Sequence, residues 1–146
     1  MKVIGKPRRR VDGRAKVTGQ TRFADDLVLP RMLHMRLLRS PHPHALIEEI
    51  GIERAKAYPG VHLVLTGKDF PVSFGILPVT QDEYPLAPEH VRYVGDPVAA
   101  VVAKDEQTAS EALDLIEVKY KILPTISSPE DALKNPEPRI HAYSEL

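Results

Sequence analysis

The sequence predicts an α+β domain in which a mixed β-sheet is combined with two to three helices. Three consecutive segments carry this prediction. Val98–Ala103 is an uninterrupted apolar run, which is typical of a strand covered on both faces. After Asp105, apolar residues recur three and four positions apart, as on one face of a helix. Val118, Tyr120 and Ile122 then alternate with lysines, which indicates a half-buried strand.

Length and composition narrow the class of protein. The chain has 146 residues, so we expect residues 1–146 to form one domain. Its 20 basic and 20 acidic side chains balance, so the overall charge does not favour nucleic acid or an anionic membrane as a partner. Without cysteine, this chain offers no disulfide, cysteine-ligated zinc, iron–sulfur ligation or thiol catalysis. No apolar signal-peptide region or membrane-length run occurs, so we expect a cytoplasmic location.

The first elements are short. Lys6–Arg10 is basic, and since no aromatic residue interrupts its arginines we interpret it as a solvated segment that docks on a neighbour. Turn signals at 11–13 and 18–20 flank a short segment, and Arg22–Asp26 resembles a short strand. Leu33–Ser40, which lies between two prolines and alternates apolar and polar residues, is predicted to be a strand.

A histidine pair follows in Pro41–His44, where two prolines hold the chain extended. His42 and His44 would point the same way and could form half of a metal site. The favoured reading is a rigid connector whose imidazoles bond to the backbone, because no further ligand stands at a suitable spacing.

The middle of the chain reads as strand, helix and strand. The expected elements are a strand at Ala45–Ile52, a short helix at Glu53–Tyr58 ended by Pro59 and Gly60, and a strand at Val61–Thr66.

The segment Gly67–Pro88, here called the proline-rich loop, has no regular pattern. It contains several prolines and three aromatic residues that look exposed. Long loops of this kind inside a small domain usually have a function or a partner. We therefore predict a contact with a partner or a substrate channel, carried by Phe74, Gly75, Tyr84 and Arg92. The alternative is that Phe74 and Tyr84 fold back onto the core of their own domain.

The last third holds the clearest elements. Gly95 is expected to supply a turn or bulge before the apolar strand, and Pro97 to fix the entry to it. Asp105 is the expected N-cap of the striped helix. Near the end, Ser128 followed by Pro129 signals the start of another short helix.

Known catalytic and nucleotide-binding signatures are absent. The sequence contains no GxGxxG, GxxxxGK[ST], GxSxG or HExxH. The turn between the apolar strand and the striped helix has no glycines to cradle a phosphate. Residue chemistry alone therefore predicts no catalytic, cofactor-binding or metal-binding residue in this chain.

An ordered series of motifs nevertheless resembles a known family. The motifs are Val11–Gly19 (VDGRAKVTG), Phe23–Asp26 (FADD), Leu38–Ala45 (LRSPHPHA), Val94–Ala103 (VGDPVAAVVA), and Glu117–Tyr120 (EVKY) with Leu123 and Pro124. In this order they resemble the N-terminal a/b hammerhead domain of the molybdopterin-binding large subunit in the xanthine dehydrogenase and aldehyde oxidase family. Within that family, the stretch Ser73–Ala100 looks most like the 4-hydroxybenzoyl-CoA reductase alpha subunit.

The resemblance implies a place in a larger molybdenum-dependent hydroxylase or reductase. Such an enzyme would contain molybdopterin, [2Fe-2S] and FAD. We expect residues 1–146 to bind none of them, because we expect this segment to lack the molybdopterin-binding domains. The expected partners are the molybdopterin domains, an iron–sulfur subunit and an FAD subunit, and an aromatic acyl-CoA is one implied substrate. The alternatives are a free-standing interaction or scaffold module that partners with a separate molybdopterin chain, and an independent metal-dependent enzyme using His42 and His44.

Overall fold

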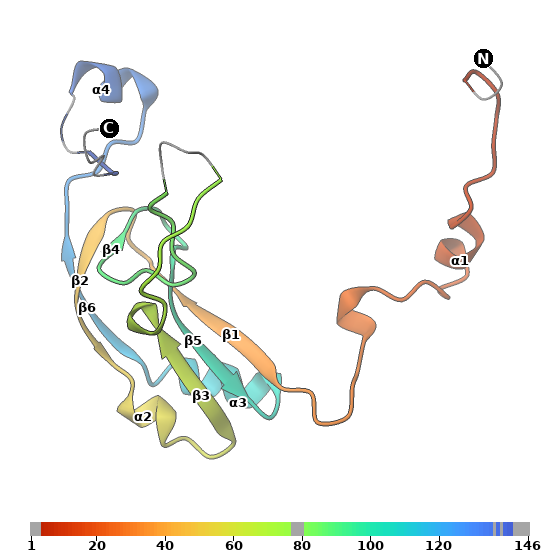
Figure 1. The fold of residues 1–146 in the computed structure, drawn as a ribbon, viewed down its shortest axis with the longest axis horizontal. Helices are drawn as coiled ribbons and strands as arrows, with labels where there is room; N and C mark the ends of the chain where they lie inside the picture. The colour runs from red at the N-terminus through yellow and green to blue at the C-terminus, as the bar shows by residue number, and fades with distance from the viewer. Residues whose placement is uncertain (1–3, 77–80, 136, 138, 142–146) are drawn as a thin grey trace. The chain divides into compact units, whose positions relative to one another are not determined.

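The computed structural model describes residues 4–76, 81–135, 137 and 139–141. The chain separates into two compact units, Met1–Met32 and Leu33–Leu146. All the strands that the structure describes belong to the larger unit, as the ribbon in Figure 1 shows. In the described part of the chain, no helix has the length and apolar character needed to cross a membrane.

In residues 4–32, the described part of the smaller unit, the chain forms a short helix and a 3-10 turn. Helix α1 (Gly13–Val17) is stabilised at its start by Asp12, whose carboxylate lies 2.6 Å from Lys16 Nζ. The strand expected at Arg22–Asp26 is wrong, because the chain forms a 3-10 turn at Ala24–Asp26. There the Asp26 carboxylate accepts a hydrogen bond from Phe23 N at 2.9 Å, which closes a local turn in place of strand pairing.

The larger unit has two three-stranded sheets, and every described strand pair is antiparallel. The first sheet has the order β1 (His34–Arg39), β5 (Pro97–Ala103), β3 (Val61–Thr66). The second has the order β4 (His90–Val91), β2 (Ala45–Gly51), β6 (Glu117–Ile122). The strands predicted for this unit are confirmed, and β5 and β6, which flank one helix in the chain, belong to different sheets.

Among its described residues, three α-helices complete the unit: α2 (Glu53–Lys56), α3 (Glu106–Leu113) and α4 (Pro129–Lys134). The predicted caps are confirmed. Asp105 Oδ1 accepts from Thr108 N at 2.7 Å, and Ser128 Oγ accepts from Asp131 N at 3.1 Å. These bonds satisfy backbone groups that the first turn of a helix leaves unpaired.

The main core lies between α3 and the first sheet. It joins α2 and α3 to β3 and β5 through eight buried residues: Ala55, Val64, Ala99, Val101, Ala103, Ala109, Ala112 and Ile116. A smaller cluster, composed of Ala45, Ala87, Val91 and Val98, lies where β2 and β4 meet the start of β5. Both clusters consist mainly of alanine and valine, so the layers approach closely. The α+β fold class is confirmed.

Candidate functional site

The two ends of the proline-rich loop are held together by backbone contact. A Cβ atom on Gly67 would lie 2.4 Å from Pro88 Cα, so only glycine permits this approach. Beside it, the Asp69 carboxylate accepts from Thr66 N at 2.7 Å and closes a 3-10 turn at Gly67–Asp69. The loop therefore leaves the end of β3 and returns to β4 through one narrow neck.

Farther from the neck, the outgoing and returning halves of the loop, here called its two arms, pair with each other at Phe74 and Glu83. Phe74 N donates to Glu83 O at 2.9 Å, and Glu83 N donates to Phe74 O at 3.0 Å. Residues 77–80 lie outside the described part of the chain. The side chain of Phe74 remains half exposed, whereas the neighbouring Tyr84 is partly buried.

Two hollows flank Tyr84 and Arg92, which line both of them. One, of about 310 Å³, is lined by Asp82, Glu83, Tyr84, Arg92, Tyr93, Asp96 and His141. The other, of about 340 Å³, is lined by Gly67, Lys68, Pro71, Tyr84, Pro88, Glu89, His90 and Arg92. The structure thus brings together two of the four predicted contact residues. Phe74 and Gly75 lie on the nearby arm and line neither hollow.

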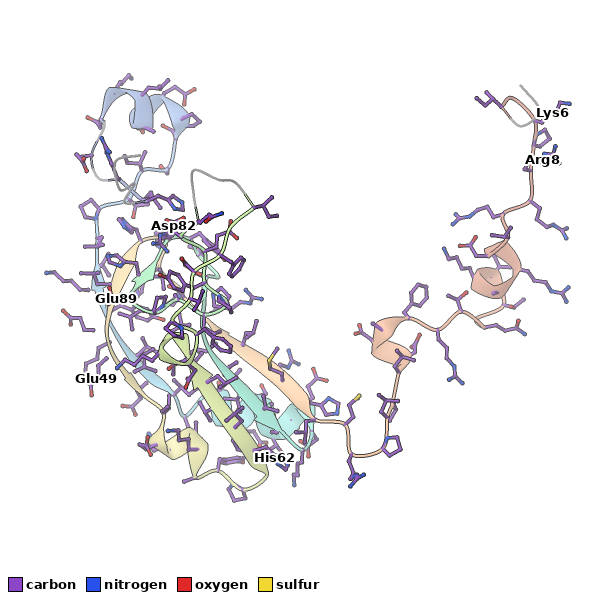
Figure 2. The ribbon with its side chains drawn as sticks, viewed as in Figure 1. Lys6, Arg8, Glu49, His62, Asp82 and Glu89 are labelled. Carbon is purple, nitrogen blue, oxygen red and sulfur yellow. The ribbon has the colours of Figure 1, made fainter. Side chains whose placement is uncertain are left out.

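Polar and charged side chains in the first hollow connect three distant parts of the chain. Asp82 Oδ2 lies 2.7 Å from His141 Nδ1 and 3.6 Å from an Arg92 guanidinium nitrogen. These contacts link the proline-rich loop, the residue after β4, and the C-terminal segment. Figure 2 shows Asp82 and His62 well apart within the larger unit, so this network lies far from the start of β3.

The network shifts the pKa values of its members. The hydrogen bond from His141 holds the pKa of Asp82 below its usual value, and the Arg92 charge adds to this effect. Burial raises the pKa of Asp96, although that carboxylate accepts a hydrogen bond from Arg92 N at 2.9 Å. In the second hollow, burial and then the Arg92 charge lower the pKa of His90.

Two polar atoms of this network are buried with no hydrogen-bond partner among the described residues, Asp82 Oδ1 and Arg92 Nε. A buried polar atom without a partner costs free energy. The other charged atoms of the network pair with each other. This arrangement is typical of a contact surface, and not of a catalytic site in which a base activates a nucleophile.

The histidines of the Pro41–His44 connector have separate structural contacts. His44 Nδ1 donates to Pro124 O at 2.8 Å, which confirms the reading of a backbone-bonded imidazole. The His42 ring instead packs edge-on against Tyr120, with centroids 5.0 Å apart. Among the described residues, no group of three or more histidine or acidic side chains is placed to hold a metal ion.

The sequence interpretation missed the main polar contacts of the site. Asp82 and His141 are 59 positions apart, and no spacing pattern relates them. Asp96 lies in the Gly95–Pro97 turn, and its carboxylate accepts from the backbone of Arg92. The positive φ of Gly95, 94°, confirms the predicted turn.

Comparison with known proteins gives one consistent result. Residues 18–124 match the family model described as aldehyde oxidase and xanthine dehydrogenase, a/b hammerhead domain. The chain is 46% identical over 142 residues to a probable xanthine dehydrogenase subunit of Bacillus subtilis, covering 95% of this chain and 19% of that protein. It is 39% identical over 142 residues to a putative xanthine dehydrogenase molybdenum-binding subunit of Escherichia coli, covering 90% and 19%.

A solved structure supports the same result. The crystal structure of quinoline 2-oxidoreductase from Pseudomonas putida 86 aligns with a TM-score of 0.76 and 40% identity, over 86% of this chain and 17% of that one. The chain therefore spans about a fifth of the length of the relatives that it matches.

Proposed function

Because this chain belongs to the aldehyde oxidase and xanthine dehydrogenase family, as an a/b hammerhead domain, we propose that it is the N-terminal structural domain of a molybdenum-dependent hydroxylase or reductase large subunit. The observation that carries this proposal is a family match over residues 18–124, together with relatives about five times as long. In this proposal the domain is not catalytic alone.

The side chains of this chain support the proposal that the cofactors are bound elsewhere in the enzyme. It has no cysteine, so it supplies no thiolate to an iron–sulfur cluster. We therefore propose that molybdopterin, [2Fe-2S] and FAD are held by other domains or subunits of the complete enzyme. We also propose a cytoplasmic location.

The proline-rich loop is the proposed contact with an iron–sulfur subunit or with the substrate entrance. Phe74 supports this role because it is half exposed and pairs through its backbone with Glu83, which lines one of the two hollows beside Tyr84 and Arg92. Phe74→Ala and Tyr84→Ala should weaken assembly with the partner subunits, measured by co-purification. Val17→Ala, on the helix of the smaller unit, is the matched control because Val17 is also exposed. Unchanged assembly of both loop variants would remove the loop from the interface.

A narrower substrate class, an aromatic acyl-CoA such as 4-hydroxybenzoyl-CoA, remains a proposal. It is supported only by the resemblance of Ser73–Ala100. The relatives are instead named for xanthine dehydrogenase and quinoline oxidoreductase. Steady-state rates of the assembled enzyme with 4-hydroxybenzoyl-CoA, xanthine and quinoline would separate these substrate classes. If xanthine is turned over and 4-hydroxybenzoyl-CoA is not, the proposal of an acyl-CoA substrate is rejected.

The test of the main proposal is assembly. The chain is co-expressed with the molybdenum-binding polypeptide encoded after or beside it in its own genome, and the mixture is purified through a tag on this chain. Recovery of a stoichiometric complex that contains molybdopterin is the expected result. If this chain elutes alone, the main proposal fails, and so does the second candidate, a free-standing interaction or scaffold module that partners with a separate molybdopterin chain. If the complex forms, the gene separates the two: a reading frame that continues from Leu146 into molybdopterin-binding domains supports the main proposal.

A further inference from the structure

Strand β5 presents apolar side chains on both of its faces, but beyond Val98, which belongs to the smaller cluster, the buried clusters account for only one of them. Ala99, Val101 and Ala103 lie in the main core with the helices. Ala100 and Val102 alternate with them and therefore point to the opposite face of the sheet. Neither residue belongs to a buried cluster of the described chain.

The strand register shows which neighbours share this second face. Met35 on β1 and Leu63 on β3 both stand opposite Val102. One step along the sheet, two leucines stand opposite Ala100 in the same way, and directly opposite side chains share a face. The six residues, which we call the open face, are Met35, Leu37, Leu63, Leu65, Ala100 and Val102.

The open face is apolar at every position and still reaches solvent. Met35 is 58% exposed and Leu63 is 49% exposed, while Leu37, Leu65 and Val102 are partly buried and Ala100, between the two leucines, is buried. In Figure 1, α3 is drawn behind the β1–β5–β3 sheet and no α-helix crosses its front. Antiparallel sheets that face water alternate apolar and polar residues, so an entirely apolar second face indicates a surface that another layer covers.

We propose that the open face is the surface on which the molybdenum-binding remainder of the large subunit packs, through an uncharged apolar layer. This inference rests on the function proposed above. About four fifths of the length of each relative lies outside the region that matches this chain, which supplies the missing layer. Because the six side chains carry no charge, the partner has no ion pair to gain there, and apolar packing of this kind is typical of permanent interfaces.

The first experiment measures burial of the open face in the complex. The sequence has no cysteine, so Met35→Cys and Leu63→Cys each introduce a single reactive thiol. Maleimide labelling is timed in this chain alone and in complex with the molybdenum-binding polypeptide of the same genome. The labelling rate should fall by at least about tenfold in the complex because a packed interface excludes solvent. Ile122→Cys, at an exposed position on the other sheet, is the matched control and should label equally in both states.

The second experiment measures what the open face contributes to affinity. Met35→Lys with Leu63→Lys places two charges on it at positions already exposed in this chain, so the fold should be retained, as checked by circular dichroism. The dissociation constant for the molybdenum-binding polypeptide should rise by at least about tenfold, because the lysines would be buried without partners. Ile122→Lys should leave it unchanged.

The outcomes separate this inference from the function on which it rests. If the wild-type chain does not bind the molybdenum-binding polypeptide, the proposed function fails. If it binds while the thiols at positions 35 and 63 label at the free rate, only the open-face inference fails. Light scattering of the chain alone tests whether a second copy of this chain packs on the open face instead. A dimer in which both thiols are protected from labelling would show that it does and would overturn the proposal.

Discussion

Gly67 shows how a single side chain, or its absence, positions the proline-rich loop. The backbone of Pro88 passes so close that a methyl group at residue 67 would overlap backbone atoms, which cannot rotate away. The neck that places Tyr84 beside Arg92 therefore depends on one glycine.

Gly67→Ala should lower the free energy of unfolding by about 2 kcal/mol or more, as overpacking against backbone does. The control is Gly51→Ala in β2, where a new Cβ would have its nearest neighbour at an ordinary 3.7 Å and should change stability by less than about 0.5 kcal/mol. Thermal unfolding followed by circular dichroism compares the two. Equal melting temperatures would contradict this account of the neck.

Asp82 should make the stability of the larger unit depend on pH. Its pKa is lowered in the folded state, so its contribution is present above the unfolded value near 4 and is lost as the pH falls through the folded value. Buried Asp96, with a raised pKa, acts in the opposite direction, so wild type and variant are compared at each pH.

For Asp82→Asn, the loss of unfolding free energy relative to wild type should be largest near neutral pH and should shrink below pH 4. Urea unfolding at pH 7, 5 and 3 measures it. Glu83→Gln, at the neighbouring exposed acid, is the control. A difference that does not vary with pH would show that the carboxylate charge of Asp82 is not what holds the network together.

At the scale of single residues, the sequence indicates which side chains belong to the candidate site but not which side chains they contact. Tyr84 and Arg92 could be selected because an aromatic and a cation stand out in and after an irregular loop. The pairing of Asp82 with His141 could not be predicted, since it arises only when the C-terminal segment returns to the loop. Local turns were predictable where a glycine demands them, as at Gly95, and failed at Ala24–Asp26, where a side chain closes the turn instead.

Helix α3 depends on small residues to approach its sheet. Ala109 and Ala112 are fully buried against β5, whose facing residues are also mostly alanine. The helix crosses the sheet at close range because neither surface has long side chains. A larger residue in this layer has no space to occupy.

Ala112→Leu should destabilise the domain by about 1–3 kcal/mol, because the added methylenes force the helix away from the sheet. Ser110→Leu adds a leucine to the exposed side of the same helix and should cost less than about 0.5 kcal/mol. Chemical denaturation gives both values. If the two variants had equal stability, the packing between α3 and the sheet would be looser than these contacts indicate.

Elements were the most predictable part of the fold, and their pairing the least. The apolar run, the Asp105 cap and the alternation after Glu117 each depend on residues within one segment. Which sheet a strand joins depends on partners far along the chain, as when β2 pairs with β6. Consecutive strands β5 and β6 could therefore be identified one by one without any indication that they separate into two sheets.

On the scale of the whole chain, the two units differ in how they are stabilised. Among residues 4–32 none is buried, whereas both hydrophobic clusters belong to the larger unit. Segments without buried apolar contacts open at little cost and are cleaved first.

Limited trypsin digestion should therefore cut within residues 1–32, which contain nine lysines and arginines, well before it cuts within residues 33–122. Mass spectrometry of the time course should show a resistant fragment that begins near Met32. The same digestion of urea-unfolded chain is the control and should leave no resistant fragment. Cleavage inside the strands at the same rate as in the smaller unit would contradict the division.

The pairing of β1 with β5 and of β2 with β6 also affects how the domain folds during synthesis. Each pair joins segments about seventy residues apart in the chain, so neither sheet can close locally. Such long-range pairing slows folding and makes it cooperative. A ribosome must release the chain through Ile122 before the second sheet can form, and until then its apolar strands are available to chaperones.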